Sequence, residues 1–353
     1  HGVRIIAFCL VCGILVFFTA KFLQVVSPRT AVRVHGMYKE PENTIDVALF
    51  GASDVYTCFY NPLAYEMFGY TSYNVCTEGT TGVLYESMVR ELRKTQDPDL
   101  YVFEMWAFQY TDQYGEVNLR RWIDSIADSP NRTQTIKEVV PEDMQESFRI
   151  PFLKYHFNWY YMKDCIQALA DKMNINRRGY SITKGYSTIT TVYSDPQEHQ
   201  PYKTSPKGME ALTGLLEYLN SEGIENVLFI RLPVYNIYDD EDSYYEAIQL
   251  IKDHGYDFLD IYAIHDEVGM DIETDYYNET HANCRGTLKM TSYLGRYIDE
   301  HYDLNKEHSE TVKKEWDYCA SFNDQIFEKC ESNIQNDINI QLWMHRDFGL
   351  QNK

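Results

Sequence analysis

Basic residues are scarce in this chain of 353 residues. It carries 32 lysines and arginines against 53 aspartates and glutamates, a formal net charge of -21 at pH 7. Proteins that bind nucleic acid contact phosphates through clustered Lys and Arg, so this balance argues against a nucleic-acid partner. It also argues against a basic patch that holds the protein on anionic lipid.

The chain also lacks the cysteine pattern of a zinc site. Of its eight cysteines, those outside the N-terminal apolar run form no Cys-x-x-Cys pair and follow no regular spacing. A chain of this length buries a full core without disulfides or metals. We therefore expect scattered buried thiols and no metal site.

A long apolar run opens the chain. Residues 5–20, IIAFCLVCGILVFFTA, carry no charge, and the run continues from Phe22 to Val26 after Lys21. About 20 apolar residues cross a bilayer, whereas a signal peptide has a shorter core and a small-residue cleavage site, which is not evident here. We expect residues 1–27 to be an uncleaved transmembrane anchor. A short N-terminus before a large acidic domain favours a single-pass protein of the cell membrane with its domain outside the cytoplasm.

Strand and helix patterns alternate through the rest of the chain. Residues 28–44 are polar and read as a linker, and the strands are expected at 45–50, 100–103, 226–230 and 258–262. Helical patterns lie near 82–94, from Ser205 to Gly223, and at 242–253 and 286–301. This alternation predicts an α/β fold, a three-layer α/β/α sandwich with a mainly parallel sheet.

Two regions stand apart from this alternation. Residues 111–200 are polar and rich in Tyr, and we expect an insertion there with helices near 119–127, 142–147 and 158–173. Residues 303–353 are expected to form a C-terminal helical extension.

Chemistry is expected where the first strand ends. In open parallel sheets, ligands bind at the carboxyl ends of the strands, and Ser53 follows directly on the strand at 45–50. A serine nucleophile needs a base, and His281 lies in a loop just before a long helix. Either residue alone is more often a helix cap or a surface histidine. The pair, in this order, is more specific.

The phrases FGASDVY, SYNVCTEGT, NVLFIRLPVYN and DYYNETHANCRGTLKMTSYL occur in this order across about residues 45–302. They resemble the blocks of the SGNH (GDSL-like) hydrolase superfamily. The nearer resemblance is to its membrane-anchored branch, which includes the teichoic-acid D-alanylation protein DltD and polysaccharide O-acetyltransferases. The resemblance implies an SGNH-hydrolase or flavodoxin-like sandwich over residues 45–302 as the catalytic domain.

The resemblance implies Ser53 as nucleophile and His281 as base. The family commonly places an acid three residues before its histidine, and here Asn278 stands at that position. An acid partner fixes the imidazole tautomer and stabilises the imidazolium. We therefore expect Asp275 to be the acid and Asn278 to orient the ring, with Glu279 as the alternative acid.

The resemblance also implies an oxyanion hole. Asn74 lies in the block that helps to form it. Backbone N–H groups of Asp54 and Gly79 are the other candidates for its donors.

The function implied by the resemblance is serine-dependent acyl transfer to a hydroxyl of a cell-envelope polymer, a teichoic acid or a polysaccharide. It needs no metal or organic cofactor, and its partner is a multipass membrane O-acyltransferase of the MBOAT type. An esterase that acts on such polymers shares the same triad, so sequence does not separate the two. A catalytically silent scaffold or glycan-binding protein is the third reading, and the missing acid at Asn278 favours it.

Overall fold

A five-stranded parallel sheet forms the centre of the computed structural model, which describes residues 2–109, 111–113, 115–344 and 346–350. The strand order is β2-β1-β3-β6-β8, the flavodoxin-like order of doubly wound sheets. The predicted α/β class and parallel sheet are confirmed. The strands are β1 (Val47–Gly51), β2 (Ser72–Cys76), β3 (Leu100–Glu104), β6 (Val227–Arg231) and β8 (Asp257–Asp260).

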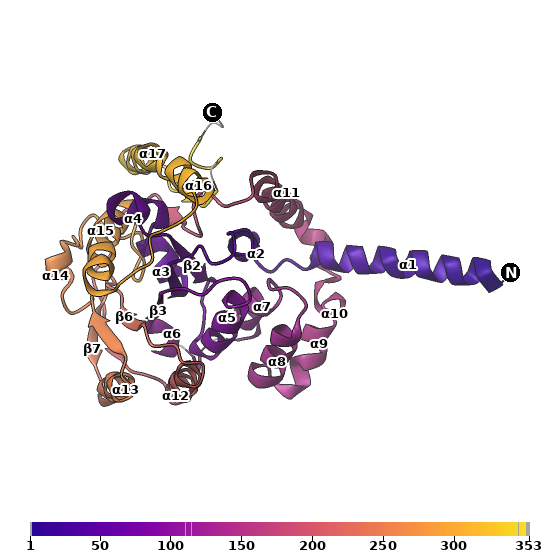
Figure 1. Cartoon of the computed structure of the whole chain (residues 1–353), viewed down its shortest axis with the longest axis horizontal. Coiled ribbons are helices and arrows are strands. Elements are labelled where there is room, and N and C mark those ends of the chain that lie inside the picture. The colour runs from indigo at the N-terminus through magenta and orange to yellow at the C-terminus, as the bar shows by residue number, and fades with distance from the viewer. Residues whose placement is uncertain (1, 110, 114, 345, 351–353) are drawn as a thin grey trace.

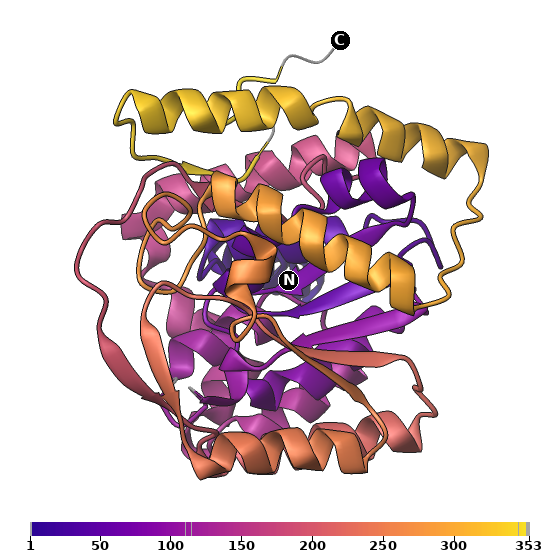
Figure 2. The same cartoon turned by 90° about the vertical axis from the view of Figure 1, so that its left-hand side faces the viewer.

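Helices cover both faces of this sheet, which is why β1, β2, β3 and β6 are buried at every position. One face packs on a core to which α5, α12 and α13 contribute, and the other on a core built with α3, α4 and α15. Figure 2 shows the sheet between these two layers. The helices are α3 (Ser53–Cys58), α4 (Asn61–Phe68), α5 (Tyr85–Leu92), α12 (Pro206–Ser221), α13 (Asp242–Asp253) and α15 (Cys284–His301).

Shorter elements connect these layers and fill their edges. Strands β5 and β7 pair in parallel, and β4 pairs with β9 in antiparallel fashion. They are β4 (Thr188–Ile189), β5 (His199–Tyr202), β7 (Ile237–Asp240) and β9 (Gln341–Leu342), with the short helices η1 (Gly82–Leu84), α6 (Trp106–Gln109) and α14 (His265–Val268).

The segment predicted as a linker at 28–44 is instead folded against the domain. Ser27 caps helix α2 (Pro28–Met37) by accepting the Thr30 N–H through its Oγ, and Pro28 takes the first helical position. Most of α2 is buried, including Arg33, whose guanidinium donates to the carbonyl of Gly185. The linker prediction failed because the polar residues of this segment find partners inside the protein.

The region 111–200 is mainly helical, as expected, but the helices differ in part from those predicted. Helix α8 was not predicted, and residues 110 and 114 lie outside the described part of the chain. The elements are α7 (Glu116–Ile123), α8 (Pro130–Val139), η2 (Glu142–Met144), α9 (Gln145–Arg149), α10 (Phe152–Tyr155), η3 (Asn158–Tyr161) and α11 (Met162–Arg178).

Two helices, α16 (Glu310–Ala320) and α17 (Asn323–Gln335), lie within the segment predicted as a helical extension. They pack on α4 and α15, respectively. All eight cysteines are free, and those outside the N-terminal helix are buried, as expected for structural thiols.

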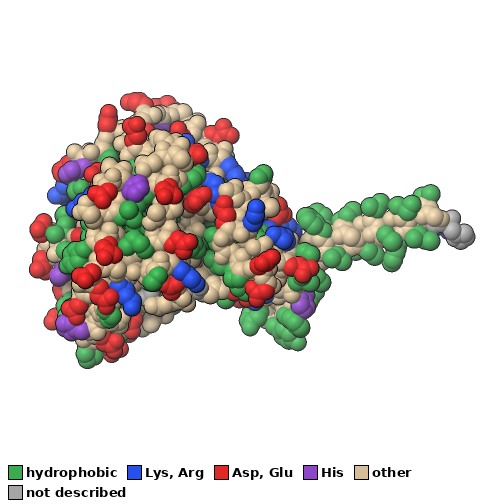
Figure 3. All heavy atoms as spheres, turned by 90° about the horizontal axis from the view of Figure 1, so that it is seen from below, with side chains coloured by type: hydrophobic (Ala, Val, Ile, Leu, Met, Phe, Trp, Pro, Cys, Tyr) green, Lys and Arg blue, Asp and Glu red, His purple; other side chains and the backbone are tan. Residues whose placement is uncertain are grey.

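Helix α1 (Gly2–Leu23) extends away from the globular part (Figure 1). Its side chains are almost all apolar and, over most of its length, exposed on every side (Figure 3). Its 22 residues correspond to about 33 Å at 1.5 Å per residue. Helix α1 is therefore long and apolar enough to cross a membrane.

Candidate active site

Ser53 and His281, 228 residues apart in sequence, meet at the carboxyl edge of the sheet. Ser53 begins α3 directly after β1, beside the point where the strand order reverses between β1 and β3. His281 lies in the loop before α15. The Ser53 Oγ is 2.6 Å from the His281 Nε2, a hydrogen bond that joins the two predicted residues.

The contacts of Asn278 define the tautomer of His281. The Thr280 backbone N–H can only donate, and it lies 3.0 Å from an Asn278 side-chain atom, which must therefore be the acceptor Oδ1. The same Oδ1 lies 2.8 Å from the His281 Nδ1. Hence Nδ1 carries the proton, and the free electron pair of Nε2 faces the Ser53 hydroxyl. Asn278, predicted to orient the ring, thus contacts it at Nδ1.

The environment of His281 favours the neutral ring. Burial lowers the pKa of His281 to about 4, although the charge of Glu279 opposes this shift. The Tyr277 ring stacks on the imidazole, with centroids 5.2 Å apart. At neutral pH, His281 is therefore ready to accept a proton.

Asp275 is not brought to His281, in contrast to its predicted role as the acid. Its buried carboxylate lies 2.6 Å from the Lys289 Nζ and accepts the backbone N–H of Asp271. The loop doubles back so that Asn283 N–H donates to the Asp275 carbonyl, which places residue 275 at the base of the loop and residue 278 near its tip. Asp275 therefore anchors the loop to α15.

Glu279, the alternative acid, is also occupied elsewhere, since its carboxylate accepts a hydrogen bond from the Tyr193 hydroxyl at 2.9 Å. Within the described part of the chain, the only side-chain oxygens in hydrogen-bond contact with the His281 Nδ1 belong to Asn278 and Thr280. The ring is thus held by neutral dipoles.

Of the three residues predicted for the oxyanion hole, only Asp54 lines the pocket with Ser53. Asn74 is buried within β2 and donates its side-chain amide to the Phe59 carbonyl. Gly79 has a φ of +63°, which favours glycine, and its carbonyl accepts from the side chain of Asn118. The next residue, Thr80, faces the pocket instead.

The pocket in front of Ser53 has a volume of about 170 Å³. Several of its residues were not predicted, although they follow strands that were. The rule that ligands bind at the carboxyl ends of strands identifies Trp106 and Ala107 after β3, and Val234 after β6. The pocket is lined by Ala52, Ser53, Asp54, Thr80, Trp106, Ala107, Val234, Thr280 and His281.

A pair of buried carboxyl groups lies beside the nucleophile. The Asp54 Oδ1 accepts backbone N–H groups of Ala52 and Val55, and the Glu104 Oε2 accepts that of Trp106 at 2.7 Å. The two carboxyl groups contact each other. Burial raises the pKa of Glu104 well above its usual range, and the neighbouring Asp54 raises it further. Burial also raises the pKa of Asp54. The pair therefore retains a proton at a pH where exposed carboxyls have lost theirs.

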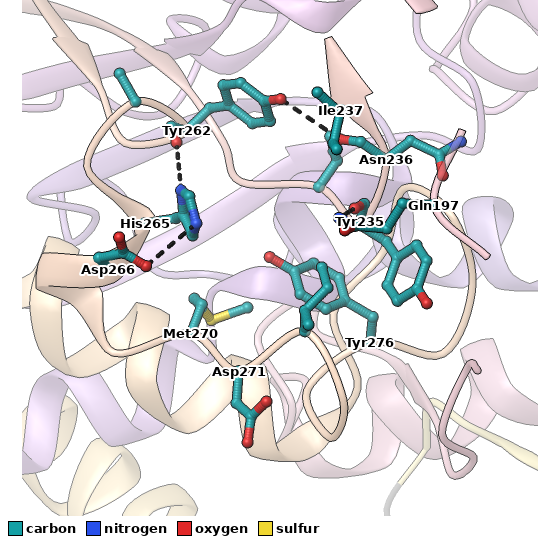
Figure 4. Close-up of a pocket in the computed structure, with 13 residues that line it drawn as sticks. Gln197, Tyr235, Asn236, Ile237, Tyr262, His265, Asp266, Met270, Asp271 and Tyr276 are labelled. Atoms are coloured by element: carbon teal, nitrogen blue, oxygen red, sulfur yellow. Dashed lines mark hydrogen bonds and ion pairs between the residues drawn. The ribbon is translucent and has the colours of Figure 1, made fainter. Parts of the chain in front are cut away.

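A larger pocket, of about 650 Å³, adjoins the first one at Val234, which lines both. Figure 4 shows His265 and Asp266 on the opposite side of this pocket from Gln197 and Tyr235. Tyrosine rings, amides and carboxylates make up most of its polar lining. Among the described residues that line it, none is Lys or Arg.

No grouping of three or more His, Cys, Asp or Glu side chains that could hold a metal ion occurs among the described residues. In comparisons with known proteins, no family model matches the chain and no curated protein matches its sequence.

Proposed function

We propose that the protein is a serine-dependent O-acyltransferase that modifies hydroxyl groups of a cell-envelope polymer through an acyl-serine intermediate. The observation that carries the proposal is the 2.6 Å contact between the Ser53 Oγ and the His281 Nε2. Nucleophile and base within hydrogen-bond reach, with a third group orienting the base, are the signature of nucleophilic catalysis. The sequence resemblance to membrane-anchored SGNH proteins adds acyl groups as the substrate class.

In the acylation step, the Ser53 Oγ attacks the acyl carbonyl while the His281 Nε2 takes the hydroxyl proton. The imidazolium that forms is stabilised by the oxygens of Asn278 and Thr280 on Nδ1. The Asp54 N–H is the proposed donor to the oxyanion. When the tetrahedral intermediate collapses, the leaving group takes the proton from Nε2 and the acyl group stays on Ser53.

The raised pKa of Glu104 supports this step. Two ionised carboxylates beside Ser53 would oppose the negative charge that develops on the oxyanion. A retained proton on the pair removes one of these charges. The pair thus lowers the electrostatic cost of placing Asp54 next to the nucleophile.

In the transfer step, an acceptor hydroxyl gives its proton to the His281 Nε2 and attacks the acyl carbonyl. The bond between the acyl carbon and the Ser53 Oγ then breaks, and Nε2 returns the proton to Oγ, so that Ser53 and His281 recover their starting states. The larger pocket next to Val234 is the proposed acceptor site, because it opens beside the nucleophile and carries side-chain hydrogen-bonding groups. Its carboxylates and its lack of Lys and Arg among the described lining residues favour a neutral polysaccharide over a phosphate-rich teichoic acid.

Helix α1 supports a location at the membrane. We propose a single-pass protein of the cell membrane with the Ser53 site outside the cytoplasm. The resemblance supports a multipass membrane O-acyltransferase as the partner that delivers the acyl group.

The test uses the full chain in detergent with p-nitrophenyl acetate as acyl donor and a neutral oligosaccharide as acceptor. Mass spectrometry measures the acetylated oligosaccharide, and the release of acetate into water is followed in parallel. The variants are Ser53→Ala and, as a matched control, Ser221→Ala at the exposed end of α12.

Acetylated oligosaccharide that requires Ser53 and survives in Ser221→Ala is the expected result. If acetate is released into water, again dependent on Ser53, and no acetylated oligosaccharide forms, the protein is an esterase and not an acyltransferase. If the wild type and Ser53→Ala give equal amounts of both products, Ser53 is not a nucleophile, and the hypothesis of a catalytically silent scaffold is the one that remains.

A further inference from the structure

Large apolar side chains are exposed between residues 150 and 173, a stretch that we call the 150–173 surface. Tyr160 is 86% exposed, Phe157 64%, Tyr161 62% and Trp159 54%. Monomeric soluble proteins rarely expose contiguous apolar surface on this scale, so such a surface indicates a partner or a membrane.

Helix α11 continues this surface along one side. Its residues Cys165, Ala168 and Ile175 are buried against the protein, whereas Leu169 and Met173 are about half exposed or more. The two exposed residues lie one turn apart, on the same side of the helix. Helix α11 is therefore apolar towards the domain and also carries an apolar stripe towards its surroundings.

The 150–173 surface is fixed to the base of α1. The side-chain amide of Asn158 donates to the carbonyls of Leu23 and Val25, at 2.8 and 3.1 Å, where α1 ends. Leu23 is fully buried in a small cluster with Tyr155 and Cys165. The direction of α1 relative to this surface is therefore set by packing and hydrogen bonds.

The views of the whole molecule agree with these contacts. In Figure 1, α10 and α11 flank the point where α1 leaves the globular part. In Figure 3, apolar side chains gather on the part of the domain next to that point. If α1 spans a bilayer, the surface of that bilayer lies where α1 leaves the globular part, next to α10 and α11.

The charge at this place differs from that of the chain. The 150–173 surface contains three Lys against two Asp, and Arg177 and Arg178 follow at the end of α11, so residues 150–178 have a formal charge of +3 within a chain of net charge -21. Lys163 and Arg177 are exposed among them. The whole-chain charge, which argued against a basic patch on lipid, conceals this local excess.

We propose that the 150–173 surface lies in the lipid–water boundary beside α1, so that the domain rests on a bilayer that carries anionic lipid. Trp and Tyr concentrate at this boundary because their rings are apolar and their N–H and O–H groups stay hydrated. Exposed Lys and Arg next to them attract anionic headgroups. Lipid fits this combination of position, aromatic side chains and local charge.

Such a contact holds the Ser53 pocket at a set height above the membrane. Ser27 and Arg29, which follow α1, both bond to the carboxylate of Glu78, two residues before Thr80 of the pocket. With α1 and the 150–173 surface both in the bilayer, the domain is attached at two places and cannot tilt freely about α1.

Tryptophan quenching tests this contact without any catalytic readout. The full chain is reconstituted in vesicles of phosphatidylcholine and phosphatidylglycerol with brominated acyl chains, which quench indole on contact. Trp159→Phe removes the exposed indole, and Trp316→Phe removes a fully buried one as the matched control. Flotation of each protein with the vesicles reports the insertion of α1.

We expect brominated lipid to reduce the tryptophan fluorescence of the wild-type protein. The size of this reduction should be at least twofold smaller in Trp159→Phe, and little changed in Trp316→Phe. Equal quenching in Trp159→Phe and wild type would overturn the proposal and leave a protein partner as the occupant of this surface. Failure of all forms to float would overturn it as well, since the contact rests on α1 spanning the bilayer.

Discussion

Asn278 occupies the position, three residues before His281, at which the family that the sequence resembles commonly has an acid, and it supplies a dipole rather than a charge to His281. Removing that dipole leaves the imidazolium with weaker stabilisation and a freer tautomer. We predict that Asn278→Ala lowers kcat/KM by about tenfold to a hundredfold, at or below the lower end of the contribution of a general acid or base, because Asn278 acts only through His281.

The matched variant is Asp275→Asn, which removes the charge of the ion pair with Lys289 and should lower thermal stability more than kcat/KM. Ester hydrolysis and thermal unfolding, measured on both variants in detergent, separate the two roles. A larger loss of kcat/KM in Asp275→Asn would return the acid role to Asp275.

The pH dependence of the reaction follows from the lowered pKa of His281. Protonated His281 cannot accept the Ser53 proton, so activity falls as the pH drops through its pKa of about 4. We predict that the acid limb of kcat/KM lies near pH 4, well below the value of about 6.5 for an unperturbed histidine. In Asn278→Asp, a carboxylate on Nδ1 should move that limb to higher pH. A wild-type limb near 6.5 would contradict the burial of the ring.

Glu104 is predicted to hold a proton in the folded state and to lose it in the unfolded chain. The pKa of Glu104 is higher in the folded than in the unfolded state. Its contribution to stability is therefore fully present at pH values below the unfolded pKa, and it declines as the pH rises above that pKa. Glu104→Gln removes this decline, since an amide takes the Trp106 N–H and donates to Asp54. The free energy of unfolding of Glu104→Gln, relative to that of the wild type, should therefore rise between pH 5 and 8. The rise is at most about 1.4 kcal/mol per pH unit. Denaturant titration at several pH values measures this change, and a difference that stays constant with pH would refute the raised pKa of Glu104.

The sequence was sufficient to pair Ser53 with His281, because each lies beside a recognisable element and the carboxyl-edge rule predicts where those elements meet. It was not sufficient for Asp275, whose distance from the ring depends on how the loop doubles back. That path is set by contacts such as Asn283 to the Asp275 carbonyl, which no local pattern encodes.

At the level of elements, strands with continuous apolar runs, such as β1 and β6, were predicted within about two residues. Strand β2 was not recognised as a strand, because Ser72 and Asn74 interrupt its apolar pattern. Their side chains are satisfied inside the fold, where Ser72 donates to Asn61 and Asn74 donates to Phe59. Partners distant in sequence therefore override the local signal.

Helix α2 depends on Glu78 for its attachment to the loop after β2. Burial raises the pKa of a carboxyl, but nearby Arg33 and the hydrogen bond from Thr30, among others, lower the pKa of Glu78 to about 2. Its stabilising contribution is present above the unfolded pKa and is lost as the pH falls towards 2. We predict that Glu78→Gln lowers the free energy of unfolding by about 2–3 kcal/mol at pH 7.

Denaturant titration of Glu78→Gln at pH 7 and pH 4 measures this contribution, with Glu210→Gln on the exposed side of α12 as control. The deficit should shrink at pH 4. A deficit that is the same at both pH values would mean that packing, rather than charge, holds α2.

The whole molecule brings three features to one end of the sheet: the Ser53 pocket, the larger pocket beside it, and the contacts that lead back to α1. The alternation of strand and helix patterns predicted the fold class, and the apolar run predicted an N-terminal helix long enough to cross a membrane, because both are patterns that extend over many residues. The sequence could not predict that Asn158 and its neighbours lie at the end of α1, or that Asp266 and Asp271 line the larger pocket. Both depend on which residues the fold places together.

The most direct measurement of the central claim is labelling of the full chain by a fluorophosphonate probe, which reacts with an activated serine. Mass spectrometry locates the label in wild type, Ser53→Ala, His281→Ala and the control Ser221→Ala. Since the probe needs the Ser53 Oγ and a neutral His281, we predict a label on Ser53 alone, none in Ser53→Ala, and at least a hundredfold slower reaction in His281→Ala. A label at another serine, or an unchanged rate in His281→Ala, would contradict the assignment of Ser53 as nucleophile and His281 as its base.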